Sequence, residues 1–210
     1  ISVKNLKVSH FIQDAEPISR LTNIEFLDLS DSKIDDLSPL YGLHNLKTLN
    51  ISNTTVSDLG PLANNNNLRE LNIENTNVRS LAPLHELNSI VKIYADGTDI
   101  STEEVVELKK IQRQVSVIYQ TDNLRIWWGN LDDSWRDIFN SHILCNSNPT
   151  SEQLQSIIDL EEIVIEPQNI VYTLEPITQM TFLKKLIVNN NQIQDLSPLS
   201  DKYFLEVLSV

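Results

Sequence analysis

Few side chains in this chain of 210 residues could do covalent chemistry, and they lie around Cys145, its single cysteine. Cys145 stands in the segment HILCNSN, three residues after His142. A nucleophilic thiolate needs an activating base or a positive field, and this segment contains no lysine, arginine or acid. A Cys145–His142 pair at a helix end is the one arrangement to check. We expect Cys145 to be a core or helix-end residue, and the chain not to be an enzyme.

Residue types that hold metals, phosphates or cofactors show no suitable spacing. The glycines are too dispersed for a loop that cradles phosphate, and the histidines show no metal-ligand spacing with Cys145. Aspartates such as Asp36, Asp58 and Asp195 recur just before prolines, where capping of a short turn explains them better than calcium binding does. We therefore expect neither a metal nor a cofactor.

The formal net charge of −13 and the pI near 4.6 limit the possible partners. A polyanion repels phosphate backbones and anionic membrane surfaces, so nucleic acid is not an expected partner. No apolar run approaches the roughly 20 residues that a membrane helix needs, so we expect no membrane insertion. The lone cysteine excludes an intramolecular disulfide but leaves the compartment open between bacterial surface, secretion and cytoplasm.

Prolines reveal the elements that position these residues. Six of the eight prolines fall into two groups with a spacing of 22 residues: Pro17, Pro39, Pro61 and Pro83, then Pro176 and Pro198. A fixed period of about 20–29 residues is typical of a solenoid. Each unit opens with L-x-x-L-x-L, as in LKTLNISNTTVSDLGPLANNNN at 46–67 and LKKLIVNNNQIQDLSPLSDKYF at 183–204.

This unit, L-x-x-L-x-L followed by x-x-[N/T]-x-[I/V] and D-L-x-P-L, resembles the leucine-rich repeat in its 22-residue, bacterial, internalin-like form. The resemblance covers most of the chain and implies an α/β fold. The expected architecture is a right-handed leucine-rich repeat solenoid with a parallel β-sheet on its concave face and a helical cap or insertion in the middle. The resemblance says little about the ligand, because one fold hosts many functions.

Alternation within the units supports the same architecture. In Leu27-Asp28-Leu29, a strand places both leucines on one side and Asp28 on the other. Proline suits the first position of a short helical turn on the opposite side, and the preceding Ser38, Gly60 and Ser197 are good caps for that turn. A buried ladder of polar side chains bound to backbone groups is expected where the chain leaves each strand. Its members are Ser32, Thr54, Thr76, Thr98 and Asn191.

Residues 101–159 depart from the repeat. The segments STEE at 101–104 and TSEQ at 150–153 each predict a helix that starts with a capping box, and VSVIY at 115–119 predicts one more strand. Asn130 is expected to cap a further helix that carries Trp135, Ile138 and Phe139 close to one face.

We predict three segments: a first repeat array at 1–119, a helical cap or junction at 120–159, and a second array at 160–210 that is cut short at its C-terminus. A helical insertion within one continuous solenoid is the alternative. Because the chain starts at Ile1 rather than at a methionine, we expect a fragment of a longer protein.

The three tryptophans, Trp127, Trp128 and Trp135, cluster in the interruption. One interpretation is an aromatic binding patch for a sugar or a partner helix. The other is the core of a cap that shields the open ends of the repeat arrays, which a solenoid requires. The second interpretation is favoured.

Two classes of function follow. The first is a non-catalytic protein-interaction module that uses the concave face, with a partner that carries a basic patch. The second is a carbohydrate-binding or surface-adhesion module that uses the tryptophan cluster. For the first, Phe26 and Tyr94 are the expected anchors on a polar, mildly acidic face. The candidate contact residues are the outward strand positions: Phe26, Asp28, Thr48, Asn50, Glu70, Asn72, Glu74, Lys92, Tyr94 and Asp96.

Overall fold

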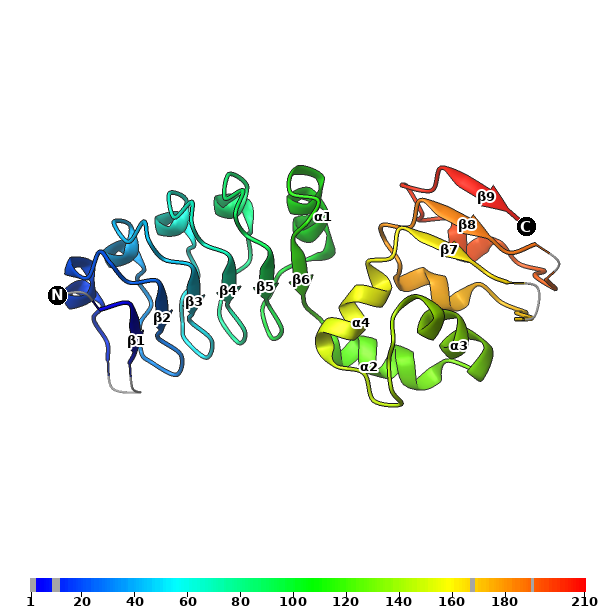
Figure 1. Ribbon diagram of the computed structural model, residues 1–210, viewed down its shortest axis with the longest axis horizontal. Helices are drawn as coiled ribbons and strands as arrows, with labels where there is room; N and C mark the ends of the chain where they lie inside the picture. Colours follow the sequence, from blue (N-terminus) through cyan, green and yellow to red (C-terminus); the bar gives the residue numbers. More distant parts are fainter. Residues whose placement is uncertain (1–2, 9–11, 167–168, 190) are drawn as a thin grey trace. The chain divides into compact units, whose positions relative to one another are not determined.

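The protein forms two compact units, Ile1–Gln120 and Thr121–Val210. The structure is a computed structural model, which describes residues 3–8, 12–166, 169–189 and 191–210 (Figure 1). The division after Gln120 lies one residue from the expected end of the first array at 119.

The first unit is built on a six-stranded parallel sheet whose strands follow one another in sequence order (Figure 1). Each strand has three residues, and consecutive strands from β2 to β5 are offset by 22 residues, as in the pair Leu27 and Leu49. The strands are β1 (Asn5–Lys7), β2 (Phe26–Asp28), β3 (Thr48–Asn50), β4 (Glu70–Asn72), β5 (Lys92–Tyr94) and β6 (Ser116–Ile118).

Short 3₁₀-helices lie between the strands and carry the regularly spaced prolines near their first residue. Within the described residues they span Glu16–Arg20, Ser38–Leu40, Gly60–Leu62 and Ala82–Leu84 in the first unit, and Glu175–Gln179 and Ser197–Leu199 in the second. Proline is tolerated there because its missing N–H would have no partner in the first turn. The expected position of the turns is therefore confirmed.

The expected cap of these turns was wrong. Ser38, Gly60 and Ser197 are not caps but the first residues of their helices. The aspartate two residues earlier makes the side-chain bond, since its Oδ1 accepts the backbone N–H of the helix's first residue. Asp36, Asp58 and Asp195 do this at 2.8, 2.7 and 2.8 Å. The recurring aspartates thus have a turn-forming role.

The inward strand residues form the core of the first unit, as the alternation predicted. Leu27, Leu29, Leu49, Ile51, Leu71 and Ile73 have no exposed surface. Full burial of such a side chain contributes about 1.5–3 kcal/mol. Because the same positions recur in every repeat, the core continues along the whole sheet.

Two polar ladders fix the point where the chain leaves each strand. In the expected one, the hydroxyls of Thr54, Thr76 and Thr98 each donate at 2.7 Å to a backbone carbonyl three residues earlier. Asn191 does the same at 2.9 Å in the second unit, and its Oδ1 also accepts the N–H of Val171 one repeat earlier. Asn191 therefore links two repeats through its side chain, whereas these threonine hydroxyls donate within their own repeat. The prediction was wrong for Ser32, which is buried but whose hydroxyl has no hydrogen-bond partner.

The second ladder was not expected from the sequence. Asp31, Asn53 and Asn75 occupy the same position in successive repeats with φ between 54° and 59°. The amide of Asn53 donates to the carboxylate of Asp31, and that of Asn75 to the side-chain oxygen of Asn53, both at 2.9 Å. Asn and Asp tolerate the left-handed region better than other non-glycine residues, and Gly97 follows them at φ 71°.

A true helix replaces the 3₁₀-turn in the fifth repeat, as predicted. Helix α1 (Thr102–Ile111) begins after Ser101, whose side chain accepts the N–H of Glu104. The second half of the expected capping box is absent. Glu104 instead accepts the N–H of Leu81 at 2.7 Å and the hydroxyl of Ser80 at 3.0 Å, both in the preceding repeat.

The second unit combines three helices with a three-stranded parallel sheet (Figure 1). Within the described residues, the helices are α2 (Thr121–Asn130), α3 (Asp133–His142) and α4 (Ser151–Ile158), and the strands are β7 (Glu162–Val164), β8 (Lys185–Ile187) and β9 (Val207–Ser209). Thr150 and Gln153 form the complete capping box expected for α4. The cap of α3 is Asp132 rather than Asn130, because Asn130 is the last residue of α2.

The helices and the second sheet share one hydrophobic core. Trp135, Phe139 and Leu154 from the helices pack in the same buried cluster as Ile163 and Leu186 from the strands. The helical segment expected at 120–159 therefore packs against the second sheet, and its function as a cap stays a prediction.

Candidate functional site on the sheet of the first unit

Strand register brings eight of the ten predicted contact residues into two adjacent rows. We call the side of the first sheet that carries them the sheet face. The first row runs through Asn5, Phe26, Thr48, Glu70, Lys92 and Ser116. The second runs through Lys7, Asp28, Asn50, Asn72, Tyr94 and Ile118. The other two predicted residues, Glu74 and Asp96, each follow two positions after the second row.

Phe26 is the large apolar residue of the first row, and its side chain is exposed. It keeps 40% of its surface accessible, whereas the neighbouring Leu27 is fully buried. Strand alternation forces this difference, because successive side chains point to opposite sides of the sheet. The ring therefore has no core function, as predicted.

Asp28 lies on this face as expected, but it is covered. Only 5% of the residue is exposed, because Lys7 Nζ lies 2.8 Å from its Oδ2 and the Ser30 hydroxyl donates to its Oδ1 at 2.6 Å. Burial alone would raise the pKa of Asp28, but the bonds from Lys7 and Ser30 outweigh it, so the pKa falls below its ordinary value. A partner could reach this carboxylate only by displacing Lys7.

The second row has a structural function that sequence reasoning missed. Asp28, Asn50 and Asn72 each accept, through Oδ1, the backbone N–H two residues later, at 3.0, 3.0 and 2.9 Å. This Asx bond turns the chain at the end of each strand. The signal was present in the sequence, since Asp or Asn recurs at this position in three successive units.

Lys92 and Tyr94 form a pair at the far end of the face. Lys92 Nζ lies 5.6 Å from the centre of the Tyr94 ring, within the range of a cation–π interaction. Both side chains are half-buried. The expected anchor Tyr94 is therefore positioned by its neighbour rather than extended into solvent.

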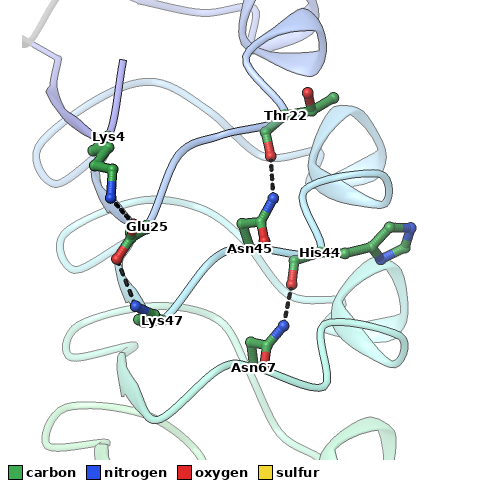
Figure 2. Close-up of polar contacts among 7 residues, drawn as sticks. All are labelled: Lys4, Thr22, Glu25, His44, Asn45, Lys47 and Asn67. Carbon is green, nitrogen blue, oxygen red and sulfur yellow. Dashed lines mark hydrogen bonds and ion pairs between the residues drawn. The ribbon is translucent and has the colours of Figure 1, made fainter. Parts of the chain in front are cut away.

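Charged residues line the edge of the face where the strands begin. Glu25, just before β2, receives Lys4 at 2.7 Å and Lys47 at 2.6 Å from the repeats on either side (Figure 2). Hydrogen bonds from Lys4 and Lys47, with their charges, lower the pKa of Glu25 to about 2. The same bond raises the pKa of Lys4. The sequence signal for this triad was the charged residue that precedes each of the strands β1 to β4.

Asparagines hold the backbone behind this triad. The side-chain amide of Asn45 donates to the carbonyl of Thr22 at 2.9 Å, and that of Asn67 to the carbonyl of His44 at 2.7 Å (Figure 2). Each bond joins one repeat to the preceding one. The charged edge therefore stands on a backbone that is fixed repeat by repeat.

Three observations decide the architecture. Strand residues align in rows, successive strands from β2 to β5 are offset by 22 residues, and alternate strand residues are buried in the core. The fold is a leucine-rich repeat solenoid. It has the α/β composition that the sequence predicted, with parallel strands on one side and helical turns on the other.

Comparison with known proteins returned solved structures only, since no family model and no curated protein matches the chain. Internalin C2 of Listeria monocytogenes is similar at 23% identity over 95% of this chain, with a TM-score of 0.42. Internalin F of the same species is similar at 22% identity over 94%, with a TM-score of 0.47. This chain spans 57% and 51% of their respective lengths.

A leucine-rich repeat protein of Leptospira interrogans is similar at 22% identity over 53% of this chain and 30% of that one, with a TM-score of 0.49. These neighbours are two internalins and a leucine-rich repeat protein from bacteria, the kind of protein that the repeat pattern was expected to resemble.

Cys145 of this leucine-rich repeat chain does not sit in an activating environment. It is half-buried in the second unit, and burial raises the pKa of its thiol. The neighbouring His142 directs Nδ1 to the carbonyl of Ile138 at 2.9 Å and to the Ser141 hydroxyl at 3.1 Å. Since a reactive thiolate requires a lowered pKa, the geometry favours a packing function for Cys145.

Among the described residues, no group of three or more His, Cys, Asp or Glu side chains could hold a metal ion. In the same part of the chain, no helix is long and apolar enough to cross a membrane.

The tryptophans belong to the core of the second unit. Trp135 has no exposed surface and Trp128 keeps 5%, while Trp127 packs at the edge of the same cluster. The indole N–H of Trp135 donates to the carbonyl of Thr173 at 3.1 Å, and that of Trp127 to Pro176 at 3.2 Å. A sugar site needs exposed ring faces, so these contacts favour the interpretation as a cap core.

Proposed function

We propose that this chain is a non-catalytic protein-interaction module and that its partner binds the sheet face of the first unit, the expected concave face. The observation that carries the proposal is the exposed ring of Phe26 within a row of aligned polar side chains. Aromatic anchors surrounded by polar contacts carry much of the binding energy of protein interfaces. Tyr94, steadied by Lys92, is the second proposed anchor.

The acidic residues of the face give the partner its proposed charge. Glu70, Glu74 and Asp96 lie in the neighbouring repeats of β4 and β5, close to Tyr94 in the register, and Glu70 stands in the same row as Phe26. Opposite charges steer association and fix orientation more than they add affinity. The partner should therefore carry a basic patch, and its affinity should fall as salt screens these charges.

The test compares two anchor variants with a control. Phe26→Ala and Tyr94→Ala should each weaken binding of a purified partner by about tenfold or more, the loss that truncation of a central anchor produces. Lys33→Ala, an exposed position beyond the strand, should bind as the unchanged chain does. A loss confined to Lys33→Ala would place the site elsewhere.

A further inference from the structure

We infer that the partner is a helix that lies across the strands of the sheet face, with acidic residues along one flank and basic residues along the other. This inference rests on the proposed function and adds the charge pattern of the partner. It follows from the distribution of charge over the face, which is not uniform. Two charged lanes of opposite sign border rows that are nearly balanced.

The strand-start lane is formed by the residues just before β1 to β4, namely Lys4, Glu25, Lys47 and Arg69. Backbone bonds of 2.8 Å join each of these residues to the next, so they lie side by side. The lane holds three cations and one carboxylate, and Lys4 and Lys47 already share that carboxylate. The lane is therefore basic overall, and Arg69 is its exposed end.

The strand-end lane is formed by the residues two and three positions after the second row, in the repeats of β2 to β5. Its charged members are Asp31, Glu74 and Asp96, and backbone bonds of 2.8–3.0 Å again join successive repeats along it. Asp31 accepts from Asn53, and Glu74 from the amide of Asn72. These neutral donors leave the carboxylate charges in place, so the lane is acidic.

The two rows between the lanes contribute little net charge. Lys7 pairs with Asp28 at 2.8 Å in the second row. Glu70 and Lys92 are register partners in the first row. The field across the face therefore comes mainly from its two edges, and it runs along the strand direction.

Dimensions favour a helix as the occupant. Between the lanes each strand contributes three extended residues, or about 10 Å at 3.2–3.4 Å per residue, and the turn that follows adds to this width. A helix is about 10–12 Å wide, so long charged side chains on its flanks reach both lanes. Its pitch of about 5.4 Å is close to the strand spacing of about 4.8 Å. One acid and one base per helical turn can thus face successive repeats.

The test titrates the whole 210-residue chain with synthetic helical peptides of equal length. Binding is measured from the changes in the chain's amide chemical shifts by NMR. One peptide carries Glu on one flank and Lys on the other. A second has the same composition with both charges mixed on each flank, and a third carries Lys on both flanks. The two-sided peptide should bind at least tenfold more tightly than either control, with shifts in both lanes. Arg69→Glu should weaken it severalfold, whereas the matched Lys33→Glu should not.

The outcomes separate the inference from the proposed function. If the mixed or all-Lys peptide binds as tightly as the two-sided one, or if no peptide shifts the face, the charge pattern is rejected. If a control peptide binds as tightly as the two-sided peptide and the chemical shifts still change on the sheet face, the proposed function stands without the charge pattern. Shifts that map to the 3₁₀-helices with every peptide would reject the proposed function itself.

Discussion

At the scale of single residues, the environment of a side chain depends on residues one repeat away. Asp28 was expected to be exposed, because strand alternation points it away from the core. It is instead covered by Lys7, 21 positions earlier, at 2.8 Å. The burial of Leu27 could be predicted from alternation alone, since it depends only on local geometry. The cover of Asp28 could not, because it depends on which side chain the preceding repeat places beside it.

Glu25 should titrate at about pH 2 in the folded chain, well below its ordinary value of 4.5. Because its folded pKa is lowered, its bonds to Lys4 and Lys47 stabilise the fold above pH 4.5, and that contribution is lost as the pH falls toward 2. Carboxyl chemical shifts against pH measure this. Lys4→Ala and Lys47→Ala should each raise the pKa of Glu25, and Lys33→Ala should leave it unchanged. A titration near 4.5 in the unchanged chain would show that the triad does not form.

Leu71→Ala should lower the free energy of unfolding by about 2–5 kcal/mol, because it leaves a cavity in a close-packed core. Leu71 has no exposed surface in the middle of the first array. Glu70→Ala, one residue earlier on the opposite side, should change stability by less than about 0.5 kcal/mol. Denaturant unfolding measures both. Equal losses would mean that the strand register is wrong.

At the scale of elements, what could be predicted depended on whether the signal was local. The 3₁₀-turns and strands recur with proline and leucine, and α4 carries its capping box in TSEQ, so these were found. Helix α2 was not predicted as a separate helix, although Thr121 and Asp122 at its start are residues of the kind that cap helices. The Asp31–Asn53–Asn75 ladder was missed because its bonds run between repeats and its residues adopt positive φ.

Gly97→Ala should destabilise the first unit by about 1–3 kcal/mol, because a left-handed conformation disfavours a Cβ. A Cβ at this position would also lie 2.2 Å from Asn75 Oδ1 at the end of the ladder. Gly42→Ala is the matched control, since a Cβ there meets nothing within 4 Å. Thermal or denaturant unfolding compares the two. Gly97→Ala with unchanged stability would contradict the ladder geometry.

The tryptophans of the helical segment should emit at blue-shifted wavelengths and resist quenching by iodide. Trp128 and Trp135 are buried in the core shared with the second sheet, and Trp127 packs against Phe139 with ring centres 5.4 Å apart. Trp127→Phe should remove most of the remaining quenching, because its ring is the most exposed of the three. Full access of iodide to all three rings would rule out a packed cap.

At the scale of the whole chain, the two units differ in what their sequences build. The first unit carries the aligned rows of the sheet face, while the second buries its tryptophans in a core of helices and strands. The repeat made the solenoid predictable, because one pattern specifies strand, turn and core in every unit. The candidate site was predictable only as a set of aligned positions. Which of these positions stay accessible depends on contacts between particular side chains, such as Lys7 with Asp28 and Lys92 with Tyr94. The repeat pattern does not specify those contacts.

Hydrogen–deuterium exchange of the chain with a purified partner tests the central claim most directly, because it maps the bound surface without altering it. The account predicts slower exchange confined to the strands of the first unit and the residues that flank them, at 25–31, 47–53, 69–75 and 92–97. The turns at 38–40, 60–62 and 82–84 should exchange as in the free chain. Protection of those turns, or of the helices of the second unit, with the strands of the first unit unchanged would contradict it.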